Sequence, residues 1–376
     1  MIYLDYAAST PMSDEALQTF LSASKQYFAN ERSLHDLGSN SALLLKTARK
    51  QLATLLDSDE SAIYFTSGGS ESNSLAIQTL LESTKKTGKQ IITTKCEHSS
   101  IINLLERLST KGYEITYIPV NVNGVINLDE LQKNISENTV LAVFQHVNSE
   151  IGTIQPIEAI SEILSKYDIL FHCDCVQSFG KIEINPYKLG VTSLSISSHK
   201  LYGPKGVGAV YINPRIAWEP LIPGTSHENG FRPGTVNVPA IASFVTAATT
   251  LSQHLRKNYE HYRILHEELI NLLKPFPNKF IIEGQNEFSV PHIIGIRIPG
   301  LEGQYVLLEC NRHQIAISTG SACSIGMQKP SDTLLAIGRN ENEAKQFFRV
   351  SFGIMTTVDD IRKLGKVLIS IAENNE

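Results

Sequence analysis

The sequence lacks the features that assign a chain to a membrane, to secretion or to nucleic acid. No apolar run approaches the roughly 18 residues that a membrane span needs, and residues 1–5 do not lead from a basic region into an apolar signal core. The formal net charge of -5 provides no basic field that could gather nucleic acid. We therefore expect a cytoplasmic protein that binds neither a membrane nor nucleic acid.

Cysteine is also scarce, and this excludes a disulfide framework. Five cysteines in 376 residues are too few and too scattered for such a framework; they are Cys96, Cys173, Cys175, Cys310 and Cys323. Reduced thiols are therefore expected, with one of them a candidate for reactivity. No repeat or low-complexity tract is present either.

Strand and helix patterns alternate along the first two thirds of the chain. Short runs rich in β-branched and aromatic residues predict strands over residues 62–66, 90–94, 115–120, 140–145, 169–173, 193–196 and 208–212. Helical patterns separate them, and this order is typical of an α/β fold with a mostly parallel sheet. Apolar residues at helical spacing predict one long bridging helix over residues 238–275, ended by Pro275 and Pro277.

The chain is too long for one ordinary core, which predicts a second, smaller domain. Its expected elements are strands at residues 292–298 and 348–352 and helices at residues 302–312 and 357–373. We predict a large domain of residues 14–255 and a small α+β domain formed by residues 1–13 and 256–376.

Lys200 ends a short polar stretch that follows a buried strand. The preceding residues are Ser197, Ser198 and His199, and a glycine-rich turn follows at residues 202–206. A lysine amine attacks a carbonyl only as the free base, and a buried strand end lowers the pKa of such an amine. Lys200 is therefore a candidate for Schiff-base chemistry, although an isolated lysine in a polar turn is more often a solvated side chain.

Glycines also join a predicted strand to a helix at residues 66–73. Gly68, Gly69 and Ser70 leave the first amides of the helix exposed, and those amides with the helix dipole form a phosphate site. The Gly-Lys-Ser/Thr ending of a P-loop and the spacing of a dinucleotide fingerprint are both missing. The alternative interpretation is a plain helix cap with flexible glycines.

Asp174 ends the predicted strand before Lys200, in the sequence His172, Cys173, Asp174, Cys175. Alternate residues of a strand face opposite sides, so one metal ion could not easily collect all four side chains, and we expect no metal site. A carboxylate at this strand end can pair with the protonated ring nitrogen of a pyridine cofactor. The 26-residue separation from Lys200 allows one crossover connection to a neighbouring strand, which would direct both side chains into one crevice.

A phosphate cradle, a strand-end aspartate and a strand-end lysine in this order resemble the fold type I enzymes that use pyridoxal 5'-phosphate (PLP). More narrowly, the chain resembles cysteine desulfurases of the NifS/IscS type in the class V aminotransferase superfamily. The resemblance covers nearly the whole chain and rests on residues 3–8, 66–73, 97–98, 146–152, 174–178, 197–206, 232–235, 318–323 and 349–353. It implies a large domain with a seven-stranded, mostly parallel sheet flanked by helices, and a smaller α+β domain that carries a catalytic cysteine.

The resemblance also implies residue roles. Lys200 would hold PLP as a Schiff base, Asp174 would pair with the pyridinium, and His98 would stack on the ring and transfer protons. The remaining cofactor contacts would come from Gly69, Ser70, Asn148, Gln177, Ser197, Ser198 and His199, with Thr235 reaching the phosphate of the other subunit of a homodimer. Arg349, with Asn148, would bind the substrate carboxylate, for which a bidentate guanidinium is suited; its alternative is a structural ion pair.

Cys323 distinguishes the possible reactions. In the resembling family, this thiolate attacks the sulfur of cofactor-bound L-cysteine, which leaves a persulfide on Cys323 and releases L-alanine. A free thiol with a pKa of about 8.5 is only slightly ionised at neutral pH, so the site must assist its deprotonation. The persulfide would pass to a sulfur-acceptor protein, such as an iron–sulfur scaffold or a dedicated client enzyme.

Two alternatives remain open at this point. The chain could be another class V enzyme, an aminotransferase or a selenocysteine lyase, although a transaminase does not need Cys323. It could also be a non-enzymatic scaffold, against which the presence of Lys200, Asp174 and Cys323 argues. Two segments depart from the family pattern, at residues 30–33 and 224–228, and there partner or substrate access is expected to differ.

Overall fold

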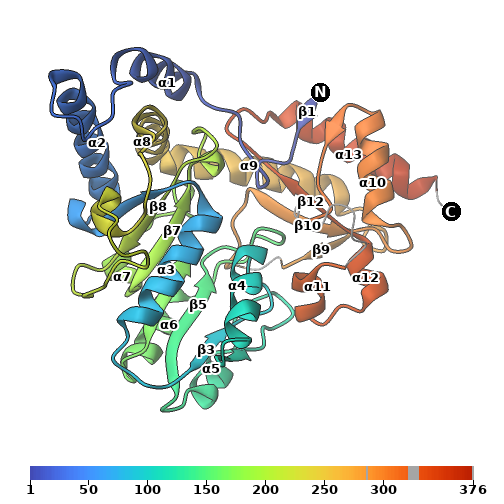
Figure 1. Ribbon diagram of the computed structural model, residues 1–376. Helices are drawn as coiled ribbons and strands as arrows, with labels where there is room; N and C mark the ends of the chain where they lie inside the picture. Colours follow the sequence, from blue (N-terminus) through green and yellow to red (C-terminus); the bar gives the residue numbers. More distant parts are fainter. Residues whose placement is uncertain (285–286, 321–329, 375–376) are drawn as a thin grey trace.

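A seven-stranded sheet forms the larger part of the computed structural model, which describes residues 1–284, 287–320 and 330–374 (Figure 1). The strands lie in the order β2-β8-β7-β6-β5-β3-β4. They are β2 (Ile63–Thr66), β3 (Gln90–Thr93), β4 (Glu114–Tyr117), β5 (Thr139–Gln145), β6 (Leu170–Asp174), β7 (Ser193–Ser197) and β8 (Gly208–Ile212). All seven predicted strands are confirmed, with ends that differ from the prediction by at most a few residues.

Strand direction places the candidate site at one edge of this sheet. β8 runs antiparallel to both β2 and β7, whereas the other neighbouring pairs are parallel. β2 therefore runs in the same direction as β7, and the carboxyl ends of β2, β3, β5, β6 and β7 meet at one edge. Open α/β sheets bind their ligands at such an edge.

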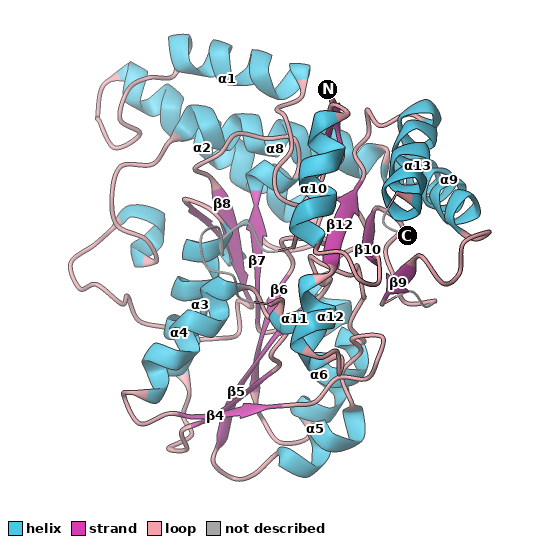
Figure 2. Cartoon of the chain, turned by 90° about the vertical axis from the view of Figure 1, so that its right-hand side faces the viewer, coloured by secondary structure: helices cyan, strands magenta, loops and turns pink. Residues whose placement is uncertain are grey.

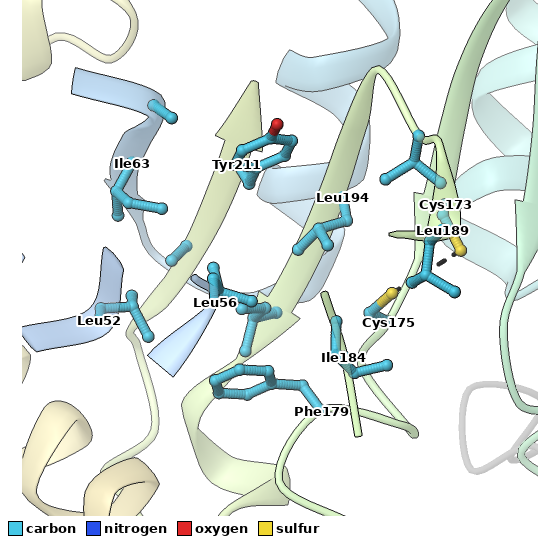
Figure 3. Close-up of a cluster of buried hydrophobic side chains, with 14 of the residues drawn as sticks. Leu52, Leu56, Ile63, Cys173, Cys175, Phe179, Ile184, Leu189, Leu194 and Tyr211 are labelled. Atoms are coloured by element: carbon cyan, nitrogen blue, oxygen red, sulfur yellow. Dashed lines mark hydrogen bonds between the residues drawn. The ribbon is translucent and has the colours of Figure 1, made fainter. Parts of the chain in front are cut away.

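Helices cover both faces of the sheet, which explains why β5, β7 and β8 are buried along their whole length. α3 (Gly69–Ser83) and α4 (Ser99–Ser109) pack on one face. α2 (Asp36–Leu55), α6 (Ile157–Ser165) and α8 (Val238–Gln253) pack on the other. Figure 3 shows part of the core on this other face, where Leu52 and Leu56 lie opposite the strands that carry Leu194 and Tyr211.

Three further helices complete this part of the chain within the described residues. They are α1 (Asp14–Gln26), α5 (Leu128–Asn134) and α7 (Pro186–Leu189), with 3-10 turns at Glu60–Ala62, Ser198–Lys200 and His227–Gly230. α1 packs against α8, and the Ser243 hydroxyl of α8 donates to the Ala16 carbonyl over 2.6 Å.

The single long helix predicted over residues 238–275 is wrong. The chain forms two helices, α8 and α9 (Leu255–Leu273), which are separated at His254. His254 has φ -114° and ψ 13°, outside the helical region, and its ring lies 2.9 Å from the Thr250 carbonyl. Neither glycine nor proline marks this break, and the apolar spacing continues across it. The sequence therefore gives no signal that one helix ends and another begins here. α9 leads from the larger sheet toward a second core (Figure 1).

The second core surrounds a small antiparallel sheet of order β12-β10-β9 (Figure 2). The elements of this part of the chain are β9 (Ile281–Glu283), β10 (Ile293–Arg297), β12 (Phe347–Ser351), α10 (Gly303–Arg312) and α13 (Val358–Glu373), with α11 (Asp332–Ala336) and α12 (Glu341–Lys345) packed in a separate small cluster that includes Ile151. The strands and helices expected near residues 292–298, 302–312, 348–352 and 357–373 are thereby confirmed.

The N-terminal segment belongs to this second region. β1 (Ile2–Tyr3) pairs in parallel with β11 (Ile315–Ala316), and Leu4 is buried in the second core with residues of α9, β12 and α13. Because the two regions have separate hydrophobic cores, we propose the division into residues 14–255 and residues 1–13 with 256–376. Within the described residues, the helices are too short or too polar to cross a membrane.

Candidate active site

Lys200 and Asp174 both lie at the carboxyl edge of the large sheet. Asp174 is the last residue of β6, and Lys200 ends the single 3-10 turn that follows the neighbouring strand β7. The Lys200 ammonium donates to the backbone carbonyls of Ala7 and Ala8, over 2.6 and 2.8 Å. The N-terminal segment therefore lies directly on the candidate Schiff-base lysine.

Two hydrogen bonds fix the orientation of the Asp174 carboxylate. Oδ2 accepts from Asn73 Nδ2 over 2.8 Å, and Oδ1 accepts from the Val176 amide over 2.9 Å. The residue is almost fully buried. A buried, hydrogen-bonded carboxylate stays in one position and can pair with a protonated ring nitrogen.

Asn73 is held by a network of buried polar side chains, none of which is among the residues predicted for the site. Its Oδ1 accepts from His172 Nε2 over 3.0 Å and from the Ser195 hydroxyl, while His172 Nδ1 lies 2.7 Å from the Ser193 hydroxyl. Burial lowers the pKa of His172 to about 3, so the ring is neutral at physiological pH. A signal was present in the alternating serines of β7, because buried hydroxyls need polar partners.

The turn between β2 and α3 forms a small cradle. Gly68 has φ 149°, which favours glycine, and a Cβ atom on Gly69 would lie 2.9 Å from Val176 Cγ2. Gly69 and Ser70 are the first two residues of α3, whose first amides have no acceptor within the helix. The buried Ser197 hydroxyl lies beside these glycines and has no hydrogen-bond partner among the described residues. Helix amides and an unpaired hydroxyl fit the phosphate of PLP.

Ser198 and His199 are placed differently from Ser197. The Ser198 hydroxyl is buried against Gly203, where a Cβ atom would lie 2.3 Å from it. His199 Nδ1 lies 3.3 Å from the Ser9 hydroxyl. Burial, then the charge of Lys200, lowers the pKa of His199 to about 4, so this imidazole is neutral at physiological pH.

His98 caps helix α4 at the same edge. Its Nδ1 accepts from the Ser100 amide over 3.1 Å, so in the neutral ring the proton lies on Nε2. The Ser100 hydroxyl accepts from Asn73 Nδ2 over 3.1 Å and connects His98 to the aspartate network. Desolvation by the surrounding protein lowers the pKa of His98; Asp174 opposes this shift and Lys200 adds to it.

Gln177 and Asn148 are buried near these residues. Gln177 Nε2 donates to the Ala7 carbonyl over 2.8 Å, the same carbonyl that accepts from Lys200. Asn148 Oδ1 accepts from the amides of Glu150 and Ile151, each over 2.9 Å. Asn148 thus orders its own loop after β5.

Arg349 forms a structural ion pair, which was the alternative to its predicted role in binding the substrate carboxylate. Its Nη2 lies 2.6 Å from Asp5 Oδ1, and Nη1 donates to the Ser149 carbonyl over 2.8 Å. Nε is buried and has no hydrogen-bond partner among the described residues. Cys323 lies outside the described residues.

Thr235 lies in a surface pocket between the end of α1 and the start of α8. Phe28 and Asn30 contribute to the pocket wall. The two segments that depart from the family pattern meet nearby, where Arg32 donates to the Ser226 carbonyl over 3.0 Å.

Comparisons with known proteins identify the family of the chain. The family described as Aminotransferase class-V matches residues 2–364. A NifS protein of Bacillus subtilis is 46% identical over 366 residues, covering 97% of this chain and 93% of the relative. The cysteine desulfurase IscS of Dictyoglomus turgidum is 37% identical, covering 99% and 94%. A solved NifS-like protein superposes with a TM-score of 0.92 at 31% identity, over 99% of both chains. The chain therefore belongs to the class V aminotransferase family, among its NifS- and IscS-type cysteine desulfurases.

Proposed function

We propose that this protein is a PLP-dependent cysteine desulfurase that converts L-cysteine to L-alanine and retains the sulfur as a persulfide on Cys323. The observation that carries this proposal is the meeting of Lys200, Asp174 and the α3 cradle at one sheet edge. A lysine for Schiff-base formation, a carboxylate for a pyridinium and amides for a phosphate match the three ends of one cofactor.

The residues present fit PLP. Lys200 would bind its aldehyde carbon, Asp174 its ring nitrogen, and Gly69, Ser70 and Ser197 its phosphate, with His199 as a neutral neighbour. Gln177 and Asn148 would contact the ring oxygen, and His98 would lie over the ring. Bound PLP supplies an electron sink for the bonds around the substrate α-carbon.

The chain's own residues bind the substrate and move its protons. Arg349 has one buried Nε without a hydrogen-bond partner among the described residues, and exchange of its Asp5 or Ser149 contact for the substrate carboxylate would give a bidentate pair. His98 has a lowered pKa, so it is mostly neutral at pH 7, and because its Nδ1 accepts from the Ser100 amide, Nε2 is the atom that would donate a proton to the substrate and take it back.

The sulfur step is assigned to Cys323 from the sequence. The Cys323 thiolate would attack the substrate sulfur, forming an S–S bond while the C–S bond of the substrate breaks. The released carbon takes up a proton and leaves as alanine, so the net reaction needs no external oxidant or reductant. Burial raises the pKa of Cys96 and Cys310 and makes them poor nucleophiles, and Cys173 and Cys175 have no exposed surface at which a substrate could reach them.

The proposal includes a homodimer in which Thr235 completes the site of the other subunit. Phe28 lines the pocket that contains Thr235 and is 68% exposed, and the next stretch of chain carries further exposed apolar side chains: Leu34 is fully exposed, and Leu37 and Leu43 of α2 are also exposed. Exposed apolar residues gathered on one part of a surface are typical of a protein interface. We also propose that the dimer acts in the cytoplasm, where its thiols stay reduced.

The sulfur acceptor is proposed by class only. The name IscS among the relatives supports an iron–sulfur scaffold as the acceptor, and a dedicated client enzyme is the alternative. A protein acceptor with an accessible thiol would take the outer sulfur of the persulfide, which regenerates Cys323.

The direct test is incubation of the purified protein with PLP and L-cysteine. Alanine and, with a thiol reductant, sulfide should appear in equal amounts. Alanine formation from selenocysteine alone would assign a selenocysteine lyase, and pyruvate-dependent alanine formation without sulfide would assign a transaminase. Absence of a visible absorbance band after addition of PLP to folded protein would overturn the proposal as a whole.

A further inference from the structure

A second lysine, Lys181, lies close to Lys200 without an assigned role. It follows β6 in a tight turn and is buried, with 9% of its surface exposed. Its ammonium group donates to Gln177 Oε1 over 3.0 Å. Buried lysines are rare because desolvation disfavours the charged amine, so a buried lysine with a defined partner calls for a physical explanation.

Lys181 and Lys200 are joined through one side chain and one backbone carbonyl. Lys181 holds Gln177 Oε1, and this orients the Gln177 amide so that Nε2 donates to the Ala7 carbonyl over 2.8 Å. The same Ala7 carbonyl accepts from Lys200 over 2.6 Å. A carboxamide can rotate to exchange its oxygen and nitrogen, and a lysine donor on one side allows only the observed orientation.

The charges around Lys181 are unfavourable to a second ammonium. Burial, followed by the positive charges of Lys200 and Arg349, lowers the pKa of Lys181 to about 7. His292 also faces it; this ring is buried, its nitrogens have no hydrogen-bond partner among the described residues, and burial followed by Lys181 lowers its pKa. The Arg349 charge is itself shared with Asp5.

We infer that Lys181 is a positioning residue of the active site, which fixes the Gln177 amide and adds a titratable positive charge beside the Schiff-base nitrogen of Lys200. This inference rests on the proposed binding of PLP by Lys200. The fixed amide directs an N–H group toward the Ala7 carbonyl. The nearby ammonium disfavours a second positive charge, so it lowers the proton affinity of the Schiff-base nitrogen while Lys181 is itself protonated.

Visible absorbance of the PLP-loaded protein, followed against pH, tests this inference. The Schiff-base band changes with protonation, so its midpoint reports the environment of Lys200 directly. Lys181→Met removes both the donor and the charge, and we expect its midpoint to rise by about one pH unit, as for the loss of a nearby like charge. Lys181→Arg keeps the donor and the charge, so its midpoint should stay close to that of the wild type. Lys181→Gln keeps a donor without the charge, so its midpoint should lie between those of Lys181→Arg and Lys181→Met.

Lys188→Met is the matched control. Lys188 lies on α7 in the same stretch of chain, its side chain is 67% exposed, and its change should leave the midpoint unaltered. A Lys181→Met protein with lower thermal stability but an unchanged midpoint would reduce Lys181 to a structural role and overturn the inference. If Lys181→Met does not fold, the Arg and Gln variants carry the same comparison, and equal midpoints in both would contradict a role for the charge. A missing band in the wild type would instead overturn the proposed function.

Discussion

Asn73 of helix α3 donates its side-chain amide to Asp174 of strand β6 over 2.8 Å. This bond joins the phosphate cradle to the carboxylate at the other end of the cofactor site, because α3 begins at the cradle. His172 and Ser195 both donate to Asn73 Oδ1, and this fixes the orientation of the Asn73 amide. Asn73 thus sets the position of Asp174 without lying at a strand end.

Replacing Asn73 with Asp should weaken PLP binding. The change keeps the side-chain size but turns a donor toward Asp174 into a second carboxylate, and repulsion would favour protonation of one of the two. We expect at least about a tenfold loss of PLP affinity, the effect of losing a buried charge-assisted bond. Absorbance titration of cofactor-free protein measures it. Asn311→Asp, on the exposed side of α10, is the control. Equal affinities would show that Asp174 does not depend on Asn73.

His172 should make the fold sensitive to acid. Its pKa is about 3 in the folded chain and ordinarily 6.5, so between these pH values the unfolded chain binds a proton that the folded chain does not. The free energy of unfolding should therefore fall as pH falls from 6.5 toward 3, by about 1.4 kcal/mol per pH unit inside this window. In His172→Gln this part of the slope should disappear. Urea unfolding at several pH values measures both slopes, and identical slopes would contradict the prediction.

Cys323→Ser should abolish sulfide release while leaving the visible absorbance band intact. A serine hydroxyl cannot form the S–S bond, whereas Lys200 and Asp174 remain in place. Cys310→Ala is the matched control, because Cys310 is a buried thiol of α10 and its loss should leave sulfide release unchanged. Alanine and sulfide are measured together. Wild-type sulfide release by Cys323→Ser would exclude the persulfide on this residue.

Arg349→Lys should weaken the capture of L-cysteine more than it slows turnover. Lysine keeps the charge but cannot form a bidentate pair with a carboxylate, so we expect KM to rise about tenfold or more and kcat to change less. Steady-state alanine formation measures both constants. Arg362→Lys, an exposed substitution on α13, is the control. An unchanged KM in a folded Arg349→Lys protein would assign Arg349 to the Asp5 ion pair alone.

Polar substitutions at the exposed apolar positions around Thr235 should dissociate the proposed dimer. Phe28→Ser combined with Leu34→Ser removes two exposed apolar side chains that a partner subunit would bury. Light scattering should show a dimer for the wild type and a monomer for the double variant. Leu308→Ser, at an exposed position of α10, should remain dimeric. A wild-type monomer would remove the role proposed for Thr235.

The sequence predicts most of the fold because buried parallel strands are short apolar runs with recognisable ends. The break at His254 escapes this reasoning, since neither glycine nor proline occurs there and the apolar spacing continues. Lys200, Asp174 and the cradle glycines are predictable for the same reason as the strands: each follows directly from a strand end. Their separate places in the sequence become one site through the strand order.

The supporting residues are less predictable. Asn73 and His172 are 99 positions apart, and only the packing of α3 on β6 brings them together. In the sequence Lys181 is an ordinary charged residue in a turn, and neither its burial nor its bond to Gln177 follows from any local pattern. Side-chain hydrogen bonds between distant elements leave no periodic pattern in a sequence, so these contacts require the three-dimensional structure.

The N-terminal segment and strand β12 meet at Ala7, and this sets an order for biosynthesis. The carbonyl of Ala7 holds Lys200, while its amide donates to the Ser351 hydroxyl over 2.9 Å, and the Ser351 amide donates to the Leu4 carbonyl over 2.8 Å. Residues 1–8 emerge from the ribosome long before β12, yet their position depends on this strand, which is made more than 300 residues later. The nascent large sheet can therefore form before its lysine has its carbonyl partners, and the site becomes complete only when β12 has left the ribosome.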